Sequence, residues 1–342
     1  MDHDDAASRD KEAVRLGFCD EEPFVRSADT ARLHAAYAQL VGARTHTDNA
    51  GEGRPPATAT GRTGSARPWS GPYGLAWDGR RLRSDRGESD REGSRVSYRH
   101  VLTKGDYSDL ASGSVLRSAP GFPAFPVRLA SEIFLRALTL RGGDAPAVVW
   151  DPCCGSGHLL SVIGLLHRRL IASLVASDIS ANALDLAAEN LLLLDPDALE
   201  ARARVLEERA ERFDKPSYLE AAGAARRLGG GLAAAGGSLP SLVRRADVFD
   251  RDELAAVTAA TTPDIVITDV PYGEQTSWLG GHGEAGVPEM LGNVASVLPG
   301  EAVLAVTARG RKVPLGTGPR PRKEFRIGTR SVALLKVAQF ST

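Results

Sequence analysis

The stretch VVWDPCCGSGHLL, residues 148 to 160, decides the fold class of this 342-residue chain. An apolar run predicts a buried strand at 148–150, and the apolar residues of 159–170 predict the helix after the turn. Between them, Asp151, Gly155 and Gly157 form the pattern D-x-x-x-G-x-G. Glycines let the backbone approach a ligand, and the N-terminus of a helix favours an anionic group. The stretch therefore predicts a site for a nucleotide-like cofactor.

The sequence around this stretch alternates between strand and helix patterns. Strands are predicted at 174–176, 264–268, 302–306 and 332–337, and helices at 126–140 and 183–194. Such alternation predicts an α/β fold, a Rossmann-like sheet with crossover helices on both faces.

The chain changes character near Val96. Residues 46–95 are rich in Gly, Arg, Ser, Thr and Asp and have few periodic apolar positions, so we expect residues 1–95 to be a largely disordered extension of a domain spanning 96–342. A further hypothesis is a misassigned start, because valine is the residue that an internal GTG codon would give at position 96.

A charged, helical insertion spans about 195–240 and is expected to break at GGGLAAAGG. It is interpreted either as a solvated helical hairpin covering the sheet edge or as a substrate-recognition appendage.

The acidic strand ends indicate which cofactor the glycine turn holds. A dinucleotide would favour a third glycine where this chain has Leu160. S-adenosylmethionine instead needs an acceptor for its ribose hydroxyls, as Asp178 would provide, and one for the adenine amino group, as Asp247 would provide beside Phe249. The order of these acidic residues favours S-adenosylmethionine.

The stretch DIVITDVPYGEQT, residues 264 to 276, indicates the reaction. Asp269 follows a buried strand and supplies a hydrogen-bond acceptor, Pro271 supplies rigidity, and Tyr272 offers a ring on which a nucleobase can stack. We expect these three residues to be catalytic, in methyl transfer to a base nitrogen.

The net charge, the cysteine count and the apolar runs of the chain limit the kinds of partner and metal site that it can have. The formal net charge is −1, so an RNA partner would have to be held by a local basic patch. Cys19, Cys153 and Cys154 match no zinc site and fit a reducing cytosol, so we expect no metal and a cytoplasmic location. No apolar run is long enough to suggest a membrane span. The residues expected to contact RNA are Arg117, Arg309, Arg311, Lys312, Arg322, Lys323, Arg326 and Arg330.

Residues 96–342 resemble the AviRa family of avilamycin-resistance 23S rRNA methyltransferases, which are class I enzymes dependent on S-adenosylmethionine. The resemblance rests on these stretches: YRH (98–100), SAPGFPAFPVRLASEIF (118–134), WDPCCGSGHLL (150–160), GLLHRR (164–169), ERFDKPSYLEAAGAARRL (211–228), ADVFD (246–250), TDVPYGEQT (268–276) and RIGTRS (326–331).

The resemblance implies a seven-stranded sheet, methylation of one guanine of 23S rRNA at N1, and protection against an orthosomycin antibiotic such as avilamycin. It implies 23S rRNA or the large ribosomal subunit as partner, and we expect a monomer. The full set of expected cofactor residues is Phe125, Pro126, Arg128, Asp151, Cys153, Gly155, Ser156, Gly157, Asp178, Asp247, Val248 and Phe249. Val270 departs from the wider D/N-P-P-Y pattern and leaves the choice of nitrogen open.

Two alternatives remain. One is a guanine N2 methyltransferase acting on rRNA or tRNA. The other is an inactive RNA-binding protein that keeps a methyltransferase fold.

Overall fold

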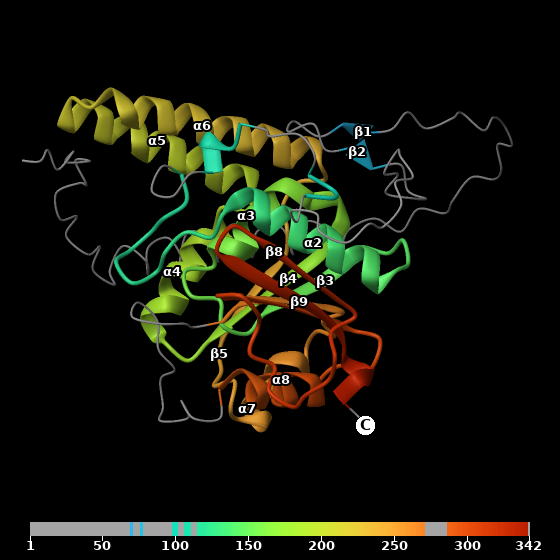
Figure 1. Ribbon diagram of the computed structural model, residues 1–342. Coiled ribbons are helices and arrows are strands. Elements are labelled where there is room, and N and C mark those ends of the chain that lie inside the picture. The colour runs from blue at the N-terminus through green and yellow to red at the C-terminus, as the bar shows by residue number, and fades with distance from the viewer. Residues whose placement is uncertain are drawn as a thin grey trace, which may run out of the picture. The chain divides into compact units, whose positions relative to one another are not determined.

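The computed structural model describes residues 69–70, 76–77, 98–101, 106–110, 115–270 and 286–340 (Figure 1). The chain divides into two units, Met1–Gly64 and Ser65–Thr342, and every described residue belongs to the second. Val96 lies outside the described residues, so the hypothesis of an internal start stays a prediction.

A seven-stranded mixed sheet forms the centre of the described unit, as predicted. In the order β5-β4-β3-β6-β7-β9-β8, only β9 runs antiparallel to its neighbours. The strands are β3 (Ala147–Asp151), β4 (Ile171–Asp178), β5 (Ser241–Arg245), β6 (Ile265–Asp269), β7 (Val303–Arg309), β8 (Lys323–Ile327) and β9 (Arg330–Lys336). Since β5, β4, β3, β6 and β7 are mutually parallel, their carboxyl ends share one edge of the sheet.

Helices cover both faces of this sheet, which confirms the prediction (Figure 1). Successive strand residues divide between two apolar clusters: Val149 packs with α2, α3 and α4, whereas Trp150 packs with α7 and α8. This alternation is the period of two that a strand buried on both faces requires. The helices are α2 (Val127–Arg141), α3 (His158–His167), α4 (Ala181–Leu192), α5 (Pro196–Phe213), α6 (Pro216–Ala234), α7 (Arg251–Thr258) and α8 (Gly286–Ser296), with short 3-10 turns η1 (Ser108–Leu110), η2 (Arg168–Leu170) and η4 (Val337–Phe340).

The helix of the insertion ends within GGGLAAAGG, as predicted, but only toward the end of that stretch. Helix α6 continues through Gly229 to Ala234, and the positive φ angles of the stretch come at Gly236 and Gly237. A Cβ on Gly229 would lie 3.4 Å from the Cβ of Leu199 in α5. The small residue therefore lets the two helices pack closely, and this packing offsets the roughly 1 kcal/mol that glycine costs inside a helix.

The α5–α6 pair contributes to the same apolar cluster as α2, α3 and α4. It therefore packs on the helical layer, and not on the sheet edge as one interpretation proposed. Its solvent side carries ion pairs from Arg226 to Glu200 and Glu207, at 3.0 and 2.5 Å. These contacts fit a solvated hairpin, while a role in substrate recognition stays a prediction.

A short antiparallel pair lies within the stretch whose composition predicts disorder. Strands β1 (Trp69–Ser70) and β2 (Ala76–Trp77) pair in the register Trp69 with Trp77. Tryptophan favours strands. The expectation that residues 1–95 form a largely disordered extension stays a prediction.

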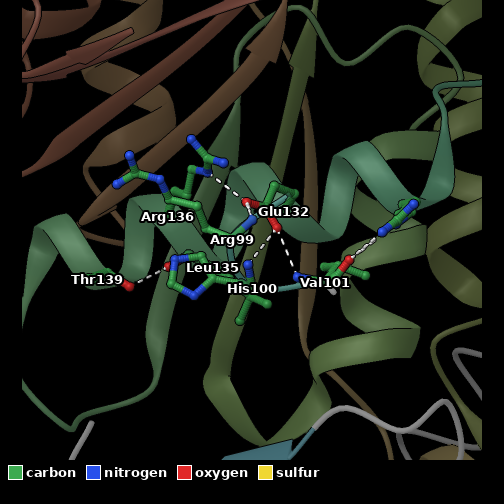
Figure 2. Close-up of polar contacts among 8 residues, drawn as sticks. Arg99, His100, Val101, Glu132, Leu135, Arg136 and Thr139 are labelled. Atoms are coloured by element: carbon green, nitrogen blue, oxygen red, sulfur yellow. Dashed lines mark hydrogen bonds and ion pairs between the residues drawn. The ribbon is translucent and has the colours of Figure 1, made fainter. Parts of the chain in front are cut away.

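A buried carboxylate on α2 holds the backbone of residues 99–101. Glu132 of α2 is fully buried and accepts hydrogen bonds from the backbone amides of Arg99, His100 and Val101, at 2.7, 3.0 and 2.9 Å (Figure 2). The guanidinium of Arg136, one turn later, donates to the same carboxylate at 2.7 Å. Because four donors surround it, the pKa of Glu132 is lowered even though burial by itself raises it.

We expect Glu132→Gln to destabilise the protein by about 3 kcal/mol, because it leaves the buried Arg136 without its counter-charge and turns an amide donor toward backbone donors. Urea unfolding measures this change. The matched control is Glu301→Gln, which removes an ion pair with Lys336 from a side chain that is 93% exposed and should cost less than about 1 kcal/mol. Equal losses in the two variants would contradict the anchoring role of Glu132.

Candidate active site

Four aspartates stand along the shared carboxyl edge of the parallel strands. Asp151, Asp178 and Asp269 are the last residues of β3, β4 and β6, which are neighbours in the sheet. Asp247 follows the end of β5 by two residues. The topology therefore brings together acidic residues that are spread over 118 positions of the sequence, from Asp151 to Asp269.

The glycine turn is held against β4 by backbone hydrogen bonds. The amide of Cys154 donates to the carbonyl of Ser177 at 3.0 Å, and the amide of Gly155 donates to Asp178 Oδ2 at the same distance. Gly155 has a φ of +52°, which a glycine adopts without strain. The turn thus joins the end of β3 to the end of β4.

Gly157 also packs closely against α4, and its expected place in the cofactor loop stays a prediction. Its φ is +69°, and a Cβ there would lie 3.1 Å from both the Cα and the Cβ of Ala187 in α4. The residue is required for the close packing of α3 against α4.

Asp178 accepts hydrogen bonds from two backbone amides and can accept further ones. Its Oδ1 accepts from the amide of Ser180 at 2.9 Å, and its Oδ2 accepts from Gly155. Burial raises the pKa of Asp178, and the bonds from these amides oppose the rise. Each carboxylate oxygen has a second lone pair, so the half-buried side chain can still accept from a ligand hydroxyl.

Asp151 is the most deeply buried of the four, only 2% exposed. Burial raises its pKa to about 7, and the nearby charges of Asp178 and Asp269 add to the rise, while the amide of Cys153, 3.1 Å from Oδ1, opposes it. A carboxyl group with this pKa is partly protonated near neutral pH. A cationic ligand bound here would favour its ionised form.

The turn after β5 is fixed by two helices. Glu253 of α7 accepts from the amide of Asp247 at 2.7 Å, and Asn293 of α8 donates to the carbonyl of Val248 at 3.3 Å. Asp247 accepts in turn from the amide of Phe249 at 2.9 Å. Val248 is buried and Phe249 half-buried against the cluster of α7 and α8.

Asp269 is held at both oxygens. The hydroxyl of Thr307 in β7 donates to Oδ1, and the guanidinium of Arg330 in β9 donates to Oδ2 at 3.1 Å. Pro271 and Tyr272, the other two residues expected to be catalytic, lie outside the described residues.

The segment before α2 approaches the turn through residues that the motifs only partly identified. Phe122, which we had not singled out, lies 3.7 Å from the position of a Cβ on Gly155. Phe125 is buried and Pro126 exposed. Arg128 donates to the carbonyl of Val101, at 2.7 Å from Nη2, and so binds the backbone at that residue. Its expected role at the cofactor site stays a prediction.

Asn190 of α4 is a further residue that sequence reasoning missed. It is fully buried and donates to the carbonyls of Ser156 at 2.9 Å and Arg117 at 3.0 Å, while its Oδ1 accepts from the amide of Arg117 at 2.7 Å. The side chain therefore ties the glycine turn to the segment that leads to Phe122. A polar residue among the apolar positions of the helix predicted at 183–194 was the available signal.

The basic residues expected to bind RNA fall into two groups. Arg309, Arg311, Lys312, Arg322, Lys323 and Arg326 are exposed; Arg309 ends β7, and the others lie on β8 and on the β7–β8 connection. Arg330 is buried against Asp269, which argues against a phosphate contact, and Arg117 pairs with Glu189 at 3.0 Å. The β7–β8 connection is anchored by the buried Val313.

Among the described residues, no group of three or more His, Cys, Asp and Glu side chains could hold a metal ion. Within the same part of the chain, no helix combines the length and the apolar character that crossing a membrane requires.

The raised pKa of Asp151 has a consequence for stability. A carboxyl whose folded-state pKa is raised stabilises the fold at low pH, and this contribution is lost as pH rises from 3.8 to about 7. We therefore expect the stability of Asp151→Asn relative to the natural chain to increase by roughly 2–3 kcal/mol between pH 5 and pH 8.

Urea unfolding at the two pH values tests this expectation. Asp185→Asn, which alters an exposed carboxylate on α4, is the matched control and should show no such pH dependence. A stability difference for Asp151→Asn that stays constant with pH would mean that Asp151 is ionised throughout.

Comparison with known proteins gives the family. The model of the family described as rRNA methyltransferase AviRa matches residues 96–330. The chain is 54% identical over 242 residues to the 23S rRNA (guanine(2535)-N(1))-methyltransferase of Streptomyces viridochromogenes, covering 71% of this chain and 96% of that protein. A solved structure of rRNA methyltransferase AviRa from the same organism, also 54% identical, aligns with a TM-score of 0.67 over 71% of this chain and 98% of its own. This chain belongs to the AviRa family of rRNA methyltransferases.

Proposed function

We propose that this protein transfers a methyl group from S-adenosylmethionine to N1 of one guanine in 23S rRNA. The observation that carries the proposal is the row of acidic strand ends, in which Asp269 stands in the sheet beside the glycine turn. The relative whose printed name specifies guanine N1 of 23S rRNA supports the choice of substrate and atom. As the sequence resemblance implies, this methylation would protect the ribosome, in the cytoplasm, against an orthosomycin antibiotic such as avilamycin.

The residues at the edge fit S-adenosylmethionine better than a dinucleotide. Asp178 retains lone pairs for two ribose hydroxyls, and Asp247 stands beside the half-buried Phe249, where it can accept from an adenine amino group. Leu160 occupies the place of the third glycine that a pyrophosphate would favour, and Gly157 is already in contact with Ala187. When bound, S-adenosylmethionine supplies an electrophilic methyl group on a positively charged sulfur.

Asp269 has the chemistry that N1 requires. Guanine N1 carries a proton at neutral pH, which must leave as the new N–CH3 bond forms. A carboxylate that accepts from this N–H orients the base and can take up the proton, which neutralises the positive charge that the incoming methyl group places on the base. With its two oxygens held by Thr307 and Arg330, Asp269 needs little reorganisation during the reaction. Positioning of the base against the methyl group supplies most of the catalysis.

The exposed basic residues would hold the RNA backbone. Six cations, at the end of β7, on β8 and on the connection between them, lie near the end of the sheet that carries β9, whose first residue contacts Asp269. Neutralising phosphates releases counterions, so binding should weaken steeply as salt rises.

Methylation of unmodified 23S rRNA, mapped by reverse transcription, tests the proposed function. We expect a strong stop at one guanine, because a methyl group on N1 blocks Watson–Crick pairing. Asp269→Asn should reduce the initial rate by at least about 100-fold while Asp185→Asn, at an exposed carboxylate, keeps it. Methyl incorporation without a stop would indicate N2, and the absence of incorporation into rRNA or subunits would favour an RNA-binding protein without activity.

The salt dependence of RNA binding tests the basic surface. We expect the double variant Arg311→Gln/Lys312→Gln to lower the magnitude of the slope of log K against log salt by about 1.4–1.8, since each lost phosphate contact removes about 0.7–0.9. The control is Arg204→Gln/Arg212→Gln, which removes the same charge from exposed positions on α5. If only the control lowers the slope, the α5–α6 hairpin holds the RNA instead.

A further inference from the structure

Three adjacent strands place one residue each around the Asp269 carboxylate. In the sheet register Asp269 of β6 stands opposite Thr307 of β7, and Arg330 opens the neighbouring strand β9. Thr307 donates to Oδ1, and Arg330 Nη2 donates to Oδ2 at 3.1 Å. Donors on both oxygens fix the rotation of the carboxylate about its Cβ–Cγ bond.

The exposure of the two charges is unequal. The side chain of Asp269 is 23% exposed, whereas that of Arg330 is 9% exposed. The carboxylate is therefore more accessible than the guanidinium that pairs with it. Burying a guanidinium costs several kcal/mol unless it is well paired, so a charge that only contacted phosphate would be better placed in solvent.

Arg330 also contacts the segment beside the glycine turn. Its Cζ lies 4.9 Å from the ring centroid of Phe125, which is 5% exposed. Phe125 belongs to the same segment as Phe122, which lies beside Gly155, and as Arg117, which Asn190 holds to Ser156. One guanidinium thus contacts both the carboxylate proposed to face the base and the segment beside the cofactor turn.

We propose that Arg330 is a positioning residue for methyl transfer. It orients the Asp269 carboxylate toward the guanine through the hydrogen bond to Oδ2. Through its contact with the Phe125 ring, it also fixes the position of Phe125 relative to that carboxylate. This inference rests on the proposed function. A lysine keeps the charge of Arg330 but lacks the planar group that stacks on Phe125, so it should replace arginine only in part.

The test compares Arg330→Met and Arg330→Lys with the natural chain, using full-length protein, 23S rRNA and S-adenosylmethionine. We expect Arg330→Met to lower kcat by about 100-fold and Arg330→Lys by about 10-fold. Calorimetry should give S-adenosylmethionine affinities within about threefold of the natural chain, and the salt slope of RNA binding should stay unchanged. A salt slope lowered by about one with an unchanged kcat would overturn the proposal in favour of a phosphate contact.

A double-mutant cycle separates positioning from a general structural effect. If Arg330 acts through Asp269, adding Arg330→Met to Asp269→Asn should lower kcat by less than about threefold, although alone it lowers kcat by about 100-fold. Equal losses in both backgrounds would overturn the proposal. If Arg330→Met does not fold, the same cycle with Arg330→Lys decides in the same way. Inactivity of the natural chain on rRNA would contradict the proposed function, a result distinct from an active enzyme indifferent to position 330.

Discussion

The convergence of carboxylates at one sheet edge is the constraint on which the rest of the site depends. Parallel strands β4, β3 and β6 end side by side in Asp178, Asp151 and Asp269. Burial, with the two neighbouring charges, raises the pKa of Asp151 to about 7. Such an arrangement is unfavourable for folding alone. It becomes favourable when a cationic ligand binds, and a sulfonium cofactor provides this charge in the proposed reaction.

The surrounding structure compensates for this concentration of charge with fixed donors. Backbone amides of the glycine turn and of the turn after β4 bind Asp178, and Arg330 and Thr307 bind Asp269. Each donor comes from a rigid element or is held by one, so the carboxylates keep their orientation without a ligand. Farther out, Asn190 holds the glycine turn to the segment before α2. Glu132 in turn holds the backbone of residues 99–101 to α2. The site is therefore continuous with the contacts that stabilise the fold.

The alternation of apolar strand and helix patterns predicted the α/β sheet, the helices on both faces and the acidic strand ends, because these follow from local patterns. The number of strands came from the resemblance to the AviRa family. The sequence missed features that depend on contacts between distant segments, such as the close approach of α3 to α4 at Gly157 and Ala187. Arg330 counted as one more member of a basic run, since only the pairing of β9 with β7 brings it toward Asp269. Asn190 belongs to no motif. Its three hydrogen bonds join it to two residues, Ser156 and Arg117, which are 34 and 73 positions away in the sequence.

The central claim is that one sheet edge contains two adjoining half-sites, one for the cofactor at Asp178 and one for the base at Asp269. Calorimetric titration of S-adenosylmethionine into Asp178→Ala and Asp269→Asn tests this division most directly. The account predicts that Asp178→Ala weakens binding by at least about tenfold, the loss of hydrogen bonds to a charged group. Asp269→Asn should bind within about threefold of the natural chain while losing methyl transfer. Unchanged affinity in Asp178→Ala, or an equal loss in both variants, would contradict the account.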